Sequence, residues 1–204
     1  MMIKKTDVTA IILAGGKSER MNGKDKGLLM INNDHIIKKL YALSKNYSTE
    51  VYVNANRNID QYRDMGFKVW EDIMPGYQGP LAGMYTSLKN SNTKYIITLP
   101  CDGPLVNDEY FKRMLNNTND QTKLRSAHDG DRIQPVYSLI SSDLLVSLKS
   151  FMDSGQRKID KWFESCELEL VDFSDNKNIF ININREADLI EYKEIINKSF
   201  ESHE

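Results

Sequence analysis

Short runs of consecutive apolar residues alternate with helical patterns through the first half of the chain. Runs such as "AIILA" (10–14) and "YIITL" (95–99) are apolar at successive positions rather than at every second one. This continuous pattern is typical of strands that helices cover on both faces. The alternation of strand and helix indicates βαβ units. The sequence therefore predicts an α/β fold with a mostly parallel central sheet and helices on both faces.

The same patterns give approximate positions for the elements. Strands are expected within 8–15, 50–56, 67–72, 94–102 and 132–140. Helices are expected within 34–46, 58–66, 79–91, 107–117, 141–155 and 158–164, and a last helix after "FININ" (180–184). Asp34 and Asn107 stand where a helix N-cap is useful. No repeat, low-complexity linker or proline-rich boundary interrupts the chain, so we expect one domain over residues 1–204.

Charge and composition exclude several classes of protein. Lys and Arg total 27 against 29 Asp and Glu, a formal charge of −2, and no strongly basic block offers a grip on nucleic acid. No apolar stretch approaches the roughly 20 residues that cross a bilayer. Cys101 and Cys166 are too few for a disulfide framework, which fits a reducing cytoplasm. We expect a cytoplasmic protein without a nucleic-acid or membrane partner.

The loop after the first strand has the composition of an anion site. Gly15 and Gly16 let backbone N–H groups approach a phosphate closely. Positive charge follows from Lys17, Arg20, Lys24 and Lys26. Neither phosphate-binding fingerprint is present, because a P-loop needs glycine where Ile11 stands and the loop does not read G-x-G-x-x-G. A tight turn with a solvated charge cluster is the alternative, but a loop of this length more often serves a function.

Polar residues follow three other predicted strands. Asp102 in "PCDGP" comes directly after an apolar run, where its carboxylate suits Mg²⁺ shared with substrate phosphates. Asn54 in "NANR" and Asp72 end neighbouring strands, and a carboxylate accepting from two adjacent N–H donors prefers guanine to adenine. Each Asp is equally suited to a turn or a cap. Ligands of open α/β sheets bind beyond the carboxyl ends of the strands, which favours the binding interpretation.

These motifs together resemble one known family. In order they are "LAGGKSERMNGKDKGL" (13–28), "NANR" (54–57), "GPLAG" (79–83), "PCDGP" (100–104), "QPV" (134–136) and "VDFSDNKNIFININ" (171–184), followed by "READL". The chain is similar to the molybdenum cofactor guanylyltransferase family, the MobA type, from residue 10 to about 190. Related cytidylyltransferases more often begin "LAAG". The resemblance implies a Rossmann-like nucleotidyltransferase fold, and transfer of GMP from GTP to the phosphate of molybdopterin, with Mg²⁺ and release of pyrophosphate.

The resemblance also implies roles for individual residues. Those expected around the nucleotide are Leu13, Ala14, Gly15, Lys26, Asn54, Asp72 and Asp102. Lys26 is expected to meet phosphates, Asp102 to carry the metal, and Arg20 to join them in catalysis. Asn182 and Asn184 are expected on the pterin side or at the catalytic centre.

One residue departs from the family pattern, and two rival functions stay open. Asn22 stands where the family has the first glycine of "RMGG", a place that Asn tolerates better than most residues. One rival is a nucleotidyltransferase that uses CTP or a sugar phosphate. The other is a module that binds GTP without turnover and hands on a cofactor, with cofactor-supplying or cofactor-accepting proteins as partners. No general base is expected, because a phosphate oxygen is already nucleophilic near neutral pH.

Overall fold

The computed structural model describes residues 1–16, 25–31, 34–76 and 78–201. It contains a seven-stranded sheet in the order β5-β4-β1-β6-β8-β7-β9. The strands are β1 (Val8–Leu13), β4 (Glu50–Asn54), β5 (Lys68–Trp70), β6 (Tyr95–Pro100), β7 (Leu124–His128), β8 (Ile133–Ser141) and β9 (Leu168–Asp172). β5, β4, β1 and β6 are parallel, whereas β8 runs antiparallel to β6 and β7. The predicted mostly parallel sheet is confirmed.

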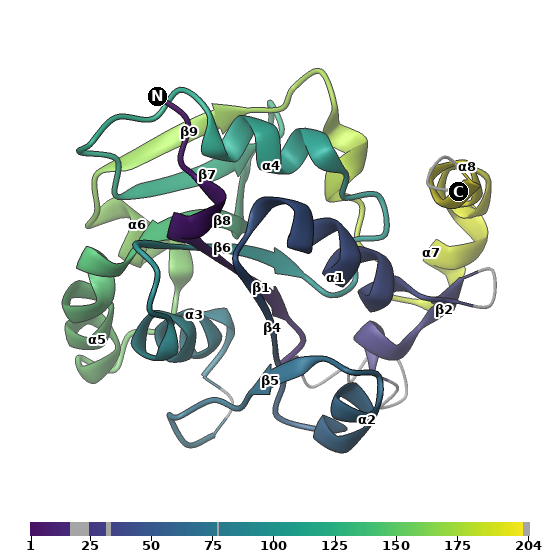
Figure 1. The fold of residues 1–204 in the computed structure, drawn as a ribbon, viewed down its shortest axis with the longest axis horizontal. Helices are drawn as coiled ribbons and strands as arrows, with labels where there is room; N and C mark the ends of the chain where they lie inside the picture. Colours follow the sequence, from purple (N-terminus) through teal and green to yellow (C-terminus); the bar gives the residue numbers. More distant parts are fainter. Residues whose placement is uncertain (17–24, 32–33, 77, 202–204) are drawn as a thin grey trace.

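Helices flank both faces of this sheet (Figure 1). The α-helices are α1 (Ile36–Tyr47), α2 (Ile59–Asp64), α3 (Pro80–Asn90), α4 (Asp108–Leu115), α5 (Leu145–Asp153), α6 (Ile159–Glu164), α7 (Glu186–Glu191) and α8 (Lys193–Glu201). Short 3₁₀ turns are η1 (Lys5–Asp7), η3 (Lys26–Leu28), η4 (Ser142–Leu144) and η5 (Lys177–Phe180), and β2 (Met30–Ile31) pairs with β3 (Asp34–His35).

The side chains of β1 divide the core into two layers. Ala10 and Ile12 pack in the cluster that contains α1 and α4, whereas Ile11 packs in the cluster that contains α3, α5 and α6. Successive residues of a strand point to opposite faces, so a strand buried on both sides must be apolar throughout. All three side chains are fully buried, and burying an isoleucine contributes roughly 1.5–3 kcal/mol. Burial on both faces of the sheet therefore explains why successive residues of β1 are apolar.

Of the two residues expected as helix N-caps, one is confirmed and the other is not. Asn107 is the N-cap of α4 and its side chain accepts from Glu109 N, as predicted. Asp34 is not an N-cap: α1 begins at Ile36 with His35 before it, and the Asp34 carboxylate accepts from His35 N at 2.9 Å. The prediction was wrong because Asp34 pairs with Ile31 in the short β2–β3 ladder and therefore stays extended.

The second half contains elements that the sequence patterns did not resolve. β9 was not predicted, and it pairs in parallel with β7 at the sheet edge. The end of the chain forms two helices, α7 and α8, rather than one. Residues 181–184 of "FININ" have no regular structure and follow η5.

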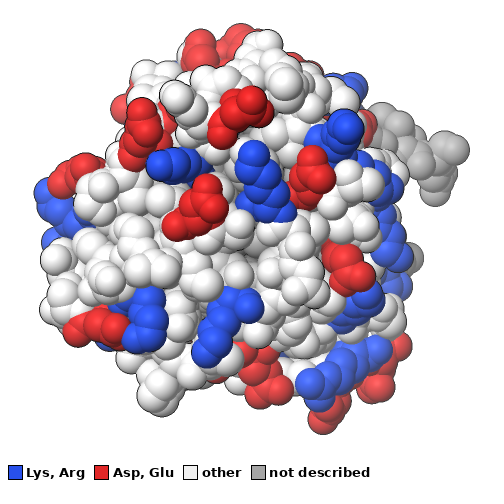
Figure 2. Space-filling view, turned by 60° about the vertical axis from the view of Figure 1, so that its left-hand side comes forward, with Lys and Arg blue, Asp and Glu red and all other residues white. Residues whose placement is uncertain are grey.

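The surface agrees with the charge pattern of the sequence. On the face drawn in Figure 2, Lys and Arg are interspersed with Asp and Glu, and that face offers no broad basic surface. Within the described ranges, none of the helices combines the length and apolar character of a membrane span. A cytoplasmic location stays a prediction.

Candidate active site

Parallel pairing brings four strand ends to one edge of the sheet. β1 pairs with β4 on one side and β6 on the other, so Leu13 lies beside Asn54 and Pro100. The pairing continues past the strands, because Ala14 N donates to Asn54 O at 2.8 Å and Cys101 N donates to Leu13 O at 3.1 Å. Backbone hydrogen bonds therefore fix the positions from which the predicted site residues project.

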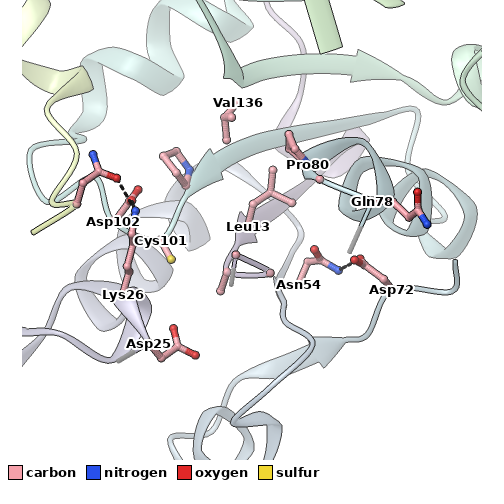
Figure 3. Close-up of a pocket in the computed structure, with 16 residues that line it drawn as sticks. Leu13, Asp25, Lys26, Asn54, Asp72, Gln78, Pro80, Cys101, Asp102 and Val136 are labelled. Carbon is pink, nitrogen blue, oxygen red and sulfur yellow. Dashed lines mark hydrogen bonds and ion pairs between the residues drawn. The ribbon is translucent and has the colours of Figure 1, made fainter. Parts of the chain in front are cut away.

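A cavity of about 650 Å³ opens at this edge (Figure 3). Its described lining includes Leu13, Ala14, Gly15, Lys26, Asn54, Asp72, Asp102 and Asn184 from the sequence prediction. It also includes Gly16, Asp25, Gln78, Gly79, Pro80, Pro100, Cys101 and Val136. Residues from distant parts of the chain thus share one space large enough for a nucleotide.

One end of the cavity is a charge pair. Lys26 Nζ donates to Asp102 Oδ2 at 2.9 Å and also donates to Asn184 Oδ1. The backbone brings the third partner in, because Ile183 N donates to Asp102 O at 2.8 Å. The irregular segment 181–184 is therefore tied to the end of β6, next to the loop that follows β1.

At the other end of the cavity lies the carboxylate of Asp72, which two side-chain amides hold in place. Asn54 Nδ2 donates to Asp72 Oδ1 at 2.9 Å, and Asn56 Nδ2 donates to Asp72 Oδ2 at 2.7 Å. Asp72 N donates back to Asn56 Oδ1 at 2.9 Å. Figure 3 shows Asn54 and Asp72 on the opposite side of Leu13 from Lys26 and Asp102. The arrangement fixes the orientation of the Asp72 carboxylate.

One predicted residue, Asn182, is not in the described lining of the cavity, and another, Arg20, cannot be placed from the described residues. Asn182 Oδ1 accepts from Tyr137 OH at 2.9 Å, and Asn182 is absent from the described lining. Arg20 lies outside the described residues, as do Lys17, Asn22 and Lys24. The substrate and catalytic roles of Asn182 and Arg20 stay predictions.

Sequence reasoning missed Asp25 and Gln78. Asp25 has a recognisable signal, because an Asp two residues before Gly27 N often accepts from that backbone group, as it does here at 3.1 Å. Gln78 sits in an irregular loop and its sequence context gives no signal. Its Oε1 accepts from Arg157 Nε, and its Nε2 donates to Pro75 O at 2.9 Å. Arg157 therefore reaches the cavity through Gln78.

Gly83 explains how α3 approaches the strand ends so closely. A Cβ at this position would lie 2.3 Å from Asn54 Oδ1 and 2.8 Å from Leu13 Cδ2. Both distances are too short for real atoms, so only glycine fits without movement. The glycine therefore serves the close packing of α3 against the strand ends.

Cys101 lines the cavity but is unsuited to act as a nucleophile. Burial and the neighbouring Asp102 charge raise the pKa of the Cys101 thiol well above its usual value. The thiolate, the reactive form, is therefore disfavoured. His35 and His128 are not among the described lining residues. Apart from Cys101, the polar side chains in the described lining are carboxylates, one ammonium group and amides.

The comparisons with known proteins agree with this geometry. A family model described as "MobA-like NTP transferase domain" matches residues 10–170. The chain belongs to the MobA-like NTP transferase family. The predicted resemblance and the nucleotidyltransferase fold are confirmed.

Relatives in this family cover nearly the whole chain. A molybdenum cofactor guanylyltransferase of Shewanella pealeana is 43% identical over 178 residues, covering 87% of this chain and 89% of the relative. One of Vibrio campbellii is 36% identical over 194 residues, covering 95% and 99%. Among solved structures, the molybdopterin-guanine dinucleotide biosynthesis protein A of Archaeoglobus fulgidus superposes with a TM-score of 0.76. It is 19% identical over 93% of this chain and 99% of that chain, a likeness of fold alone.

Proposed function

We propose that this member of the MobA-like family transfers GMP from GTP to the phosphate of molybdopterin that carries molybdenum. The products are the molybdopterin guanine dinucleotide cofactor and pyrophosphate. One observation carries the proposal: a single cavity joins a lysine–aspartate pair at one end to an amide-held carboxylate at the other. The names of the relatives support the same reaction.

The Asp72 end is suited to a guanine edge. A carboxylate has about four acceptor positions, and the amides of Asn54 and Asn56 use one on each Asp72 oxygen. The positions that remain match two adjacent N–H donors, which guanine presents on its N1 and N2. Cytosine presents a single amino donor, so this end favours GTP over CTP.

The Lys26 end is suited to phosphate. A lysine ammonium has three N–H donors, and two of them point to Asp102 and Asn184. Among the described residues the third donor has no hydrogen-bond partner, and we assign it to a phosphate oxygen of GTP. By the family resemblance we assign Arg20 to the triphosphate as well.

The carboxylates in the cavity suit a divalent cation. The described lining carries three carboxylates, on Asp25, Asp72 and Asp102, against the single ammonium of Lys26. A triphosphate entering such a space needs further positive charge. Asp102 has one described side-chain donor, Lys26, and Mg²⁺ often takes one or two carboxylates together with substrate phosphates. We assign Mg²⁺ to Asp102; when bound, it neutralises phosphate charge and polarises the phosphoryl oxygens.

The residues of the chain then hold two anions in line. A molybdopterin phosphate oxygen forms a bond to the α-phosphorus of GTP, and the bond to the β-phosphate breaks with its electron pair leaving on pyrophosphate. Lys26 and the backbone of Gly15 and Gly16 stabilise the developing charge. No general base is assigned. Asn184 faces the same cavity, and we place the pterin on the side of Asn182 and Asn184.

Nucleotide selectivity tests the proposal. Purified protein is given molybdopterin, Mg²⁺ and one nucleoside triphosphate at a time, and pyrophosphate release is measured. We expect release with GTP and a much slower rate with CTP, ATP or UTP. A preference for CTP would favour the rival nucleotidyltransferase, and tight GTP binding without release would favour the non-catalytic module.

A further inference from the structure

Asp25 is a buried carboxylate in the cavity wall, next to Lys26 in the chain. It is 6% exposed. Its Oδ1 accepts from Gly27 N at 3.1 Å and from Tyr62 OH at 2.8 Å. Its Oδ2 accepts from Asn58 Nδ2 at 3.0 Å and lies 3.8 Å from Arg57 Nε. The carboxylate therefore accepts three hydrogen bonds and also lies beside the Arg57 guanidinium.

The number of polar partners separates Asp25 from Asp102. Both carboxylates line the same cavity, but Asp102 has one described side-chain partner and Asp25 has three. A metal ligand needs lone pairs that are free of other donors. Asp25 is thus less suited than Asp102 to bind the cation, and its hydrogen bonds serve the segment that it belongs to.

The partners of Asp25 are rigidly placed. Tyr62 on α2 is fully buried, and burial raises the pKa of its hydroxyl, so the hydroxyl stays a donor. A Cβ on Gly27 would lie 2.5 Å from the Tyr62 hydroxyl, so the turn η3 lies directly against this ring. Asn58 has φ 51° and ψ 28°, a left-handed conformation that Asn tolerates.

One short turn holds both ends of the cavity. Residues 54–58 begin at the last residue of β4, and four of their side chains divide between two carboxylates. Asn54 and Asn56 donate to Asp72. Arg57 and Asn58 contact Asp25 instead. The base side and the phosphate side of the cavity are therefore both held by side chains from the same short segment of backbone.

We propose that Asp25 is a positioning residue for Lys26: anchored by Arg57, Asn58 and Tyr62, it fixes the η3 turn from which Lys26 reaches the phosphates. A lysine has a flexible four-carbon stem, so its ammonium is placed only as well as its backbone is. Asp25 fixes that backbone on both sides of Lys26, through its own anchors and through Gly27 N. The inference rests on the proposed function, which assigns Lys26 to the triphosphate.

A double-mutant cycle tests whether Asp25 acts through Lys26. The affinity for GTP with Mg²⁺ is measured by calorimetry for the wild type, Asp25→Asn, Lys26→Ala and the double variant. Asp25→Asn turns an amide donor toward Asn58 or Arg57 and breaks that link at constant size. We expect it to weaken GTP binding by on the order of 10- to 100-fold, the cost of misplacing one binding group. In the Lys26→Ala background the same change should cost less than twofold.

Full additivity of the two losses would overturn the proposal, since it would show that Asp25 supports the protein without involving Lys26. Two milder variants keep the test decisive if Asp25→Asn unfolds. Tyr62→Phe removes one donor at constant shape, and Asn58→Gly removes another while glycine keeps the left-handed backbone. Each should weaken GTP binding only while Lys26 is present, and a loss that persists without Lys26 would also overturn the proposal.

The cycle is independent of the proposed reaction. It measures binding, whereas guanylyl transfer is judged by pyrophosphate release from the wild type. A protein that binds GTP without turnover contradicts the function and leaves the cycle to decide on Asp25. A wild type that binds no GTP overturns the role of Asp25 as well.

Discussion

Lys26 Nζ lies 2.9 Å from Asp102 Oδ2, although 76 positions of sequence separate the two residues. The pair joins the loop after β1 to the end of β6 and closes one end of the cavity. Its polar partner is Asn184, from a third segment. In the proposed reaction these opposite charges serve opposite needs, since Lys26 meets the phosphates and Asp102 holds the cation that accompanies them.

Replacing Asp102 should abolish turnover without unfolding the protein. Asp102→Asn keeps the size of the side chain but removes the charge that balances a divalent cation. We expect kcat to fall on the order of 100- to 1000-fold, as when one charge-stabilising group is lost from an active site. The measurement is pyrophosphate release at saturating Mg²⁺, with the melting temperature as a control for folding. A kcat within threefold of the wild type would contradict the assignment.

Replacing Asp72 should change nucleotide preference more than overall activity. Asp72→Asn replaces one acceptor oxygen by an N–H₂ donor, which then faces the donating amide of either Asn54 or Asn56. The kcat/KM for GTP should fall roughly 10- to 100-fold, because a polar recognition contact is left unpaired. The value for CTP should change less than threefold. Glu71→Gln, at the exposed neighbouring position, is the matched control and should leave both values unchanged.

Gly83→Ala tests the close approach of α3. The added methyl group meets Asn54 and Leu13 at impossible distances. We expect the free energy of unfolding to fall by about 1–3 kcal/mol, the usual cost of overpacking. Gly16→Ala is the control for stability, because a Cβ there meets no heavy atom within 4 Å. Urea unfolding of both variants checks the difference, and equal stabilities would contradict the packing account.

Lys39 predicts a pH dependence of stability. Burial lowers the pKa of Lys39 from 10.5 to about 8, and its ammonium donates to Pro104 O at 3.3 Å. The unfolded chain then binds more protons than the folded chain between about pH 8 and 10.5, so the Lys39 contribution to stability rises with pH there. Lys39→Met has no ammonium group at this position, so its stability does not rise with pH for this reason. Its stability relative to the wild type should therefore be greater at pH 7.5 than at pH 9.5.

The comparison is best made by urea unfolding of both proteins at the two pH values. Tyr47 and Tyr52, whose pKa values are raised to about 12, titrate in both proteins and cancel in the difference. A difference in stability that does not change with pH would contradict the lowered pKa of the half-buried Lys39.

The parallel half of the fold was predictable because its signals are local. Strands such as β1 and β6 are buried on both faces and must be apolar throughout, which the sequence displays directly. β9 was missed because it is a sheet edge: its burial alternates only weakly, and Leu170 is exposed. Asp34 was misplaced because a two-residue ladder with β2, a pairing between chain segments, overrides its capping preference.

The site was predictable where family motifs coincide with strand ends. Asn54 is the last residue of β4, and Asp72 and Asp102 lie just past the ends of β5 and β6, so parallel pairing alone brings them to one edge. The contact of Asp25 with Gly27 N has a local signal, but the contacts of Asp25 with Tyr62 and of Gln78 with Arg157 are tertiary, and no local pattern encodes them. Asn182 matched a motif, yet its side chain contacts Tyr137. One domain over residues 1–204 stays a prediction.

The most direct test of the central claim is a crystal structure with a non-hydrolysable GTP analogue and Mg²⁺. We expect phosphate oxygens within hydrogen-bonding distance of Lys26 Nζ, the metal ion against Asp102, and the guanine edge against Asp72. An analogue bound outside the cavity, or one whose base lies at the Lys26 end and whose phosphates lie at Asp72, would contradict that claim.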